Sequence, residues 1–182
     1  GVSSSQIDLT WNQTSPDETG FRIERSPATL GTWSTVTTTA PDVVSYSDNT
    51  GLTASTSYDY RVFAESANGD SPASNTATGT TLAAPPTAPT GFTATTASST
   101  EIDLAWTDAS GDETGFQIQW SPNGTDTWTD EVTTAIDAES YTDDTGLLPS
   151  TTYYYRIRAL GAGDPSAWVG PVNATTAPTA PT

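Results

Sequence analysis

Acidic side chains in short polar stretches are the first feature of this 182-residue chain that could do chemistry. They occur singly or in pairs, as Asp17-Glu18, Asp48, Asp112-Glu113, Asp130-Glu131 and Asp143-Asp144. Loop carboxylates with nearby carbonyl oxygens suit Ca²⁺, which takes roughly six to eight oxygen ligands. Because no stretch has the D-x-D-x-D-G spacing of a calcium loop, we predict a solvated acidic surface with no metal ligands. We therefore expect no cofactor, with Ca²⁺ as the one alternative.

Paired carboxylates also serve most glycosidases as acid, base or nucleophile. The polar loops that carry these acidic pairs are short and leave little room for a substrate cleft. Histidine, cysteine and lysine are absent, which excludes zinc and haem ligation, thiol nucleophiles, histidine bases and lysine Schiff bases. We therefore predict a protein that is not an enzyme, with no catalytic and no cofactor-binding residue.

The charge balance excludes two further classes of partner. The chain carries 22 acidic and 5 basic residues, for a formal net charge of -17. Nucleic-acid binding depends on a basic surface, so nucleic acid is not expected as a partner. No apolar run approaches the roughly 20 residues of a membrane span, so no membrane insertion is expected in this segment.

The positions of these residues follow from a tandem repeat with a period of 95 residues. In that register residues 7–64 match residues 102–159 without a gap, and 31 of the 58 aligned positions are identical. The string Pro-Thr-Ala-Pro-Thr occurs at 86–90 and again at 178–182, and such proline-rich strings favour semi-rigid linkers. We predict domains over residues 1–83 and 91–177, a linker over 84–90 and a linker or tail over 178–182.

Within each unit the apolar residues recur at every second position. Ile7, Leu9 and Trp11 alternate with polar residues, and so do Tyr58, Tyr60 and Val62. This alternation is typical of antiparallel strands with one face buried. Turn-forming strings separate the strands and no stretch has helical periodicity, so the pattern predicts a β-sandwich in each unit.

Several motifs occur in the same order in both units. Each unit has an early strand tryptophan, an aromatic-x-aliphatic strand and a leucine six residues before a tyrosine: Trp11 and Trp106, Phe21-Arg-Ile23 and Phe116-Gln-Ile118, Leu52 with Tyr58 and Leu147 with Tyr153. With these motifs the chain resembles the fibronectin type III family over nearly its whole length. The string Asp17-Glu-Thr-Gly-Phe21 is similar to the version of the module found in bacterial or archaeal surface proteins.

The resemblance implies an all-β fold of two tandem, seven-stranded antiparallel sandwiches of the immunoglobulin-like kind. It implies that Trp11 and Trp106 are core residues and that Tyr58 and Tyr153 form the family's tyrosine corners. Residues 91–95 are similar to the family's first strand, but in the 95-residue register Gly1 corresponds to Thr96. We therefore expect an incomplete first strand in the first unit, and a chain that is a fragment of a longer array.

Two tryptophans differ between the units, and the fold therefore does not require them. Trp120 stands where the first unit has Arg25, and Trp168 stands where it has Ala73. Aromatic faces stack on sugars, so both residues are candidate contacts for surface glycans or another partner. The alternative is a partly buried strand residue or a contact between domains.

Two functional hypotheses follow. The first is an extracellular or cell-surface structural module, part of a repeat array that forms a stalk, surface layer or filament. Its partners would be copies of itself or neighbouring repeats, assembled head to tail. The alternative is a carbohydrate-binding or spacer module attached to a secreted carbohydrate-active enzyme or adhesin, because fibronectin type III domains also occur there.

Overall fold

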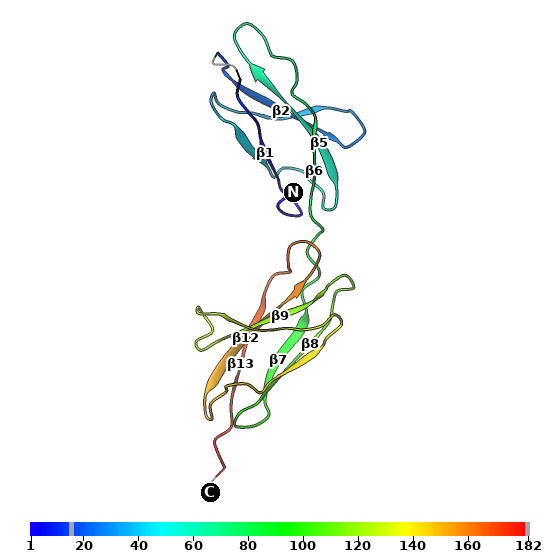
Figure 1. The fold of residues 1–182 in the computed structure, drawn as a ribbon. Coiled ribbons are helices and arrows are strands. Elements are labelled where there is room, and N and C mark those ends of the chain that lie inside the picture. The colour runs from blue at the N-terminus through cyan, green and yellow to red at the C-terminus, as the bar shows by residue number, and fades with distance from the viewer. Residues whose placement is uncertain (15–16, 181–182) are drawn as a thin grey trace. The chain divides into compact units, whose positions relative to one another are not determined.

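The chain folds into two compact units of β-strands, Gly1–Ala84 and Pro85–Thr182, shown in the computed structural model of Figure 1. The structure describes residues 1–14 and 17–180, so the predicted tail over 178–182 ends outside the described residues. Within that part every regular element is a strand, which confirms the all-β prediction. It contains no helix long and apolar enough to cross a membrane.

The first unit is a sandwich of two antiparallel sheets. β1 (Ile7–Thr10) pairs with β4 (Ser45–Asp48) in one sheet. The other sheet contains β3 (Ser34–Thr38), β2 (Gly20–Pro27), β5 (Ser57–Glu65) and β6 (Ala77–Thr80), in that order. The buried core joins β1 to the larger sheet through Ile7, Ile23, Tyr58 and Tyr60.

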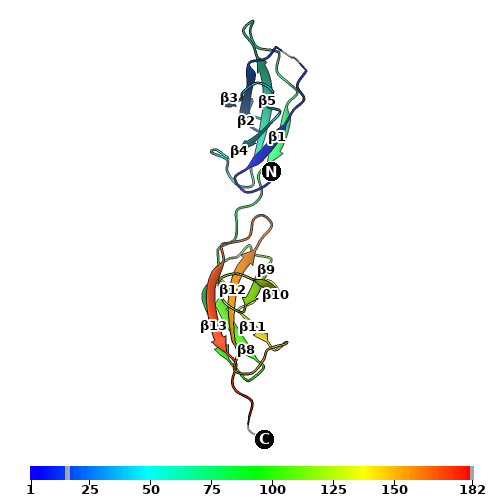
Figure 2. The same ribbon diagram turned by 90° about the vertical axis from the view of Figure 1, so that its left-hand side faces the viewer.

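The second unit repeats this plan with one more strand. Its smaller sheet has the order β11 (Ser140–Asp143), β8 (Ile102–Thr107), β7 (Thr90–Thr96). Its larger sheet has the order β10 (Thr129–Thr133), β9 (Gly115–Ser121), β12 (Thr152–Leu160), β13 (Val169–Thr175) (Figure 2). Alternate residues of β12 point into the core: Tyr153, Tyr155, Ile157 and Ala159 are all buried.

Among the described residues the first unit has six strands and the second has seven, which agrees with the predicted incomplete first strand of the first unit. That first strand is reduced to an isolated bridge between Ser3 and Gln6, and the carbonyl of Ser3 also accepts a hydrogen bond from the N–H of Leu82 at 3.0 Å. Within the described part of the chain, β1 pairs with β4 alone, and no strand covers its other side as β7 covers β8.

The missing strand changes the surroundings of one predicted core residue. Trp106 is 4% exposed, with its ring 6.4 Å from Phe92 of β7 and 5.5 Å from Phe116. Trp11 lies 5.6 Å from Phe21 but has no partner equivalent to Phe92, so it packs on the edge of the core and is only partly buried. Trp106 is thus a core residue, whereas Trp11 is a boundary residue.

The two corner tyrosines lie where the resemblance places them. The hydroxyl of Tyr58 accepts a hydrogen bond from the backbone N–H of Thr53 at 2.9 Å, and that of Tyr153 accepts one from Leu148 at 2.9 Å. Both rings are 7% exposed. Each hydrogen bond ties the segment before the strand to the strand itself.

Replacing Tyr153 by phenylalanine should therefore cost the second unit about 1 kcal/mol, the typical net value of one buried hydrogen bond. The ring stays in place, so the core packing is kept. Urea unfolding followed by tryptophan fluorescence would measure the difference. Unchanged stability would mean that the corner hydrogen bond adds nothing to the fold.

Candidate functional site

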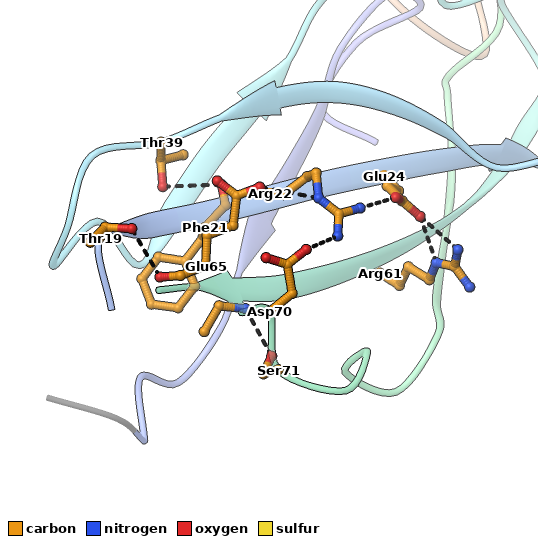
Figure 3. A network of polar contacts seen from close by, with 10 residues as sticks. Thr19, Phe21, Arg22, Glu24, Thr39, Arg61, Glu65, Asp70 and Ser71 are labelled. Atoms are coloured by element: carbon orange, nitrogen blue, oxygen red, sulfur yellow. Dashed lines mark hydrogen bonds and ion pairs between the residues drawn. The ribbon is translucent and has the colours of Figure 1, made fainter. Parts of the chain in front are cut away.

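The outer face of the larger sheet in the first unit carries a network of charges (Figure 3). Arg22 forms ion pairs with Glu24, with Glu65 at 3.1 Å and with Asp70 at 2.6 Å. Arg61 binds the other oxygen of Glu24 at 2.6 Å. These pairs connect β2, β5 and the loop after β5, so every charged group of the network has an opposite partner.

Aromatic rings lie between these arginines. The guanidinium of Arg61 is 4.3 Å from the ring centre of Trp33 and 5.1 Å from that of Phe63, which also has Arg22 at 4.2 Å. Cation–π contacts of this kind are worth about 0.5–1 kcal/mol each at exposed sites. The outer face of the first unit is thus covered by groups that satisfy one another.

The second unit builds the same arrangement with different residues, and Trp168 belongs to it. The guanidinium of Arg156 lies 4.3 Å from the ring centre of Trp128 and 4.2 Å from that of Trp168, and Arg158 lies 4.4 Å from Trp168. Gln119 and Gln117 accept hydrogen bonds from Arg156 and Arg158 at 2.8 Å. The ring of Trp168 therefore already carries two guanidinium groups.

Trp120 lies on the other side of the same sheet. Its ring packs edge-on against buried Tyr153 at 5.7 Å and contacts the core. Successive side chains of a strand point to opposite faces, so Trp120 faces inward while Gln119 and the arginines face outward. The structure therefore does not bring the two candidate glycan contacts, Trp120 and Trp168, together.

A buried ion pair stands at the position of Trp120 in the first unit. Asp48 has a fully buried side chain, and its Oδ2 accepts hydrogen bonds from Arg25 at 2.6 Å and from the hydroxyl of Tyr60 at 2.9 Å. Burial works against the charge of Arg25, but Asp48 outweighs it and the pKa of Arg25 is raised. Burial and the hydrogen bond to Asp48 also raise the pKa of Tyr60.

The second unit keeps this aspartate and tyrosine but not the arginine. The hydroxyl of Tyr155 donates to Asp143 at 2.7 Å, and Asp143 is 1% exposed. Glu131 lies beside Asp143 because a β-bulge between Asp130 and Val132 turns it toward the core, where the first unit has Val36. Two carboxyl groups thus meet where the first unit has an ion pair.

The pKa of Glu131 is raised, by burial first and then by the negative charge of Asp143. The hydroxyl of Tyr141 donates to Glu131 at 3.1 Å, and burial together with that carboxylate raises the pKa of Tyr141 to about 12. The groups around Glu131 include the carboxyl of Asp143 and the hydroxyls of Tyr141, Thr145 and Tyr155, and Asp144 lies near Tyr141.

A raised carboxyl pKa means that the folded second unit holds a proton more tightly than the unfolded chain. Stability should therefore be greatest at pH near or below the ordinary glutamate value of 4.5, and should fall as the pH rises through the raised pKa. Replacing Glu131 by glutamine should remove this pH dependence and stabilise the unit at neutral pH by about 1 kcal/mol, because the amide can donate to Asp143. Thermal unfolding between pH 4 and pH 8 would measure both effects, and identical pH profiles would refute the pairing.

The fold places the two members of the acidic pair Asp112-Glu113 in different surroundings. Asp112 is exposed, whereas Glu113 is 2% exposed and lies with Asp108 and Asp137 in a group whose carboxylate oxygens are within 4.8 Å of one another. Sequence reasoning named Glu113 but missed the other two residues. The 95-residue register held the signal, because Asp108 replaces Gln13 of the first unit.

Hollows on the surface occur beside β1 of the first unit. One of about 320 Å³ is lined by Trp11, Phe21, Val62 and Pro72, among others. A second of about 330 Å³ shares Trp11 and Val62 with it and extends to Leu9 and Tyr60. No titratable pair with a shifted pKa lies in the first hollow among the described residues, so it offers shape and apolar surface rather than catalytic groups.

The comparisons with known proteins agree with this architecture. The fibronectin type III domain model matches residues 1–80 and 87–172. Chitinase A1 of Niallia circulans is 33% identical over 97% of this chain, which covers 24% of that enzyme, and endoglucanase B of Cellulomonas fimi is 34% identical over 97%, covering 17%. The chain thus spans about a quarter or less of the length of these relatives.

A solved structure gives the same result at the level of the fold. The FN1–FN3 domains of chicken CNTN1 are 26% identical with a TM-score of 0.62, over 97% of this chain and 64% of that one. The sandwich topology, the corner tyrosines and two consecutive matches to one domain model lead to a single conclusion. The chain belongs to the fibronectin type III family, as two domains in tandem.

Proposed function

We propose that this chain is a non-catalytic spacer segment of an extracellular protein. The observation that carries the proposal is that the side chains able to bind a ligand already contact one another. All five arginines bind carboxylates, glutamines or aromatic rings of their own unit. Trp168, the sugar-stacking candidate on the outer face, is part of this arrangement. Such a face resists unspecific contacts, and the charge of -17 favours solubility.

The relatives support this setting. Enzymes named chitinase and endoglucanase share this pair of modules as a small fraction of their length, which is what a spacer beside a catalytic domain requires. These relatives are secreted enzymes, and contactin-3 of Mus musculus, a cell-surface protein, is 25% identical over the whole of this chain, so both support an extracellular location. Each unit has a core of its own, so each can fold and keep its length independently.

A pull-down of the 182-residue chain with insoluble chitin and cellulose would test the proposal. A spacer should stay in the supernatant, and Trp168→Ala should change nothing but stability. Saturable retention that Trp120→Ala or Trp168→Ala removes would overturn the proposal and support the carbohydrate-binding alternative. Release of soluble sugar from either polymer would overturn the non-catalytic part.

A second candidate function, head-to-tail assembly into a stalk or filament, is favoured by the free edge of β1. Trp11 N–H donates to Val44 O at 3.0 Å on the β4 side, so the alternation of an antiparallel ladder leaves the main-chain groups of Asp8 and Thr10 facing outward. In the second unit β7 covers that side of β8. In the first unit no strand of the described residues does so, and an extended segment of a second copy would fit there by strand addition.

Analytical ultracentrifugation over a concentration series would test self-assembly. Thr10→Pro removes one outward-facing N–H and leaves the hydrogen bonds between β1 and β4, a position at which strands tolerate proline. Association of the wild-type chain that Thr10→Pro abolishes would support the array. A monomer at every concentration would overturn it without affecting the spacer proposal.

A further inference from the structure

Two loops of the chain contain an asparagine followed directly by a glycine, Asn68-Gly69 in the first unit and Asn123-Gly124 in the second. Asparagine is thermolabile, because its side-chain amide can react with the backbone nitrogen of the next residue. A following glycine favours this reaction, since it has no Cβ to shield that nitrogen and adopts many backbone conformations. Both asparagines are exposed, so their hydrogen bonds decide which of them can react.

The side-chain amide of Asn123 is held at both of its polar atoms. Its Oδ1 accepts hydrogen bonds from the backbone N–H groups of Thr125 at 3.1 Å and Asp126 at 3.2 Å. Its Nδ2 donates to the carboxylate of Asp126 at 2.6 Å. The next residue is packed as well, because a Cβ on Gly124 would lie 2.6 Å from the ring of Tyr154. Several contacts therefore have to break before this amide can turn onto the nitrogen of Gly124.

The side chain of Asn68 is not held in this way. Over residues 1–14 and 17–180 no group forms a hydrogen bond with its amide, and only its backbone N–H is bonded, to Ser66 Oγ at 3.2 Å. Gly69 has a φ of 113°, and a Cβ at this position would have no neighbour within 4 Å. The N–H of Gly69 donates to the carbonyl of Ser66 at 3.1 Å, so one turn hydrogen bond has to open before its nitrogen can react.

We propose that Asn68 is a site of spontaneous deamidation in the folded protein and that the fold protects Asn123. The backbone nitrogen of Gly69 forms a bond to Cγ of Asn68 and loses its proton, and the side-chain nitrogen leaves with that proton as ammonia. Water then opens the cyclic imide at either of its two carbonyls, which yields aspartate or isoaspartate at position 68. The product adds one negative charge to the loop whose Asp70 pairs with Arg22 at 2.6 Å.

Incubation of the full 182-residue chain in buffer at pH 8 over days to weeks tests the site. A glutamate-specific protease then places the two asparagines in separate peptides, residues 66–101 and 114–131. Mass spectrometry follows the exchange of ammonia for water in each peptide, and fragmentation separates Asn68 from Asn75. We expect Asn68 to convert at least about tenfold faster than Asn123 in the folded chain, because each hydrogen bond that must open raises the barrier.

The matched control is the same incubation in urea, where the native hydrogen bonds are absent and the two asparagines should react at similar rates. Asn68→Gln should remove the acidic form that isoelectric focusing resolves in the aged wild type, whereas Asn123→Gln should keep it. Equal rates at the two asparagines of the folded chain would overturn the proposal. So would an Asn68 that stays unmodified in buffer, whatever its rate in urea. The site does not depend on the spacer proposal.

Discussion

Replacing Trp106 by alanine should unfold the second unit at a temperature at which the first unit stays folded. The indole is 4% exposed and packs between Phe92 and Phe116, so its loss removes two aromatic contacts and leaves a cavity. Truncating a buried tryptophan costs about 3–5 kcal/mol, which is a large part of the stability of a domain of this size. Differential scanning calorimetry would resolve the two transitions and show the shift of one.

Trp11→Ala is the matched control in the other unit. Trp11 occupies the equivalent position but is only partly buried, with Phe21 as its aromatic partner at 5.6 Å. Its truncation should cost less than half as much, about 1–2 kcal/mol, because the cost scales with the buried area that is lost. Equal losses in the two variants would contradict the assignment of Trp106 to the core and Trp11 to its boundary.

Arg25→Ala should destabilise the first unit by about 3 kcal/mol. The variant leaves the fully buried Asp48 without its cation, and removing one partner of a buried pair typically costs about 3–5 kcal/mol. We expect the lower end, because Asp48 keeps its hydrogen bonds to Tyr60 at 2.9 Å and to Thr50 at 3.1 Å. Urea unfolding at neutral pH would measure the change.

Arg22→Ala on the same strand controls for the loss of an arginine. Its partners Glu65 and Asp70 are 29% and 44% exposed, so water replaces much of these interactions. Its third partner, Glu24, keeps the ion pair with Arg61 at 2.6 Å, so the cost should stay near 1 kcal/mol. If Arg22→Ala and Arg25→Ala cost the same, burial of Asp48 does not set the strength of the pair.

Local patterns were sufficient for most of the fold. The alternation at Ile7–Trp11 and Tyr58–Val62 predicted strands with one buried face, and β1 and β5 lie there. The equivalent strands of the second unit, β8 and β12, are buried at every second residue. The repeat predicted two units of one family, which the comparisons confirm. These properties are readable because period-two burial and motif spacing depend on residues close together in sequence.

Local patterns could not predict how the surroundings of equivalent residues differ between the two units. Parity predicts the same core role for Trp11 and Trp106, but the ring that completes the packing, Phe92, belongs to a strand that only the second unit has. Glu131 follows the exposed Asp130 in β10, and a bulge there breaks the alternation of inward and outward side chains. The carboxyl of Glu131 therefore lies close to that of Asp143 in β11. A bulge inserts one residue into a strand and re-aims its side chain, and the strand sequence does not mark it.

The sequence by itself determined the fold family, the duplication and the acidic character of this protein, because composition and spacing carry them directly. Tertiary structure decided which acidic residues meet. Asp108 and Asp137 are separated by two strands and become neighbours of Glu113 only when β8, β9 and β10 take their places in the two sheets. Pairing between distant segments sets such convergence, and it is not encoded in any single stretch of the chain.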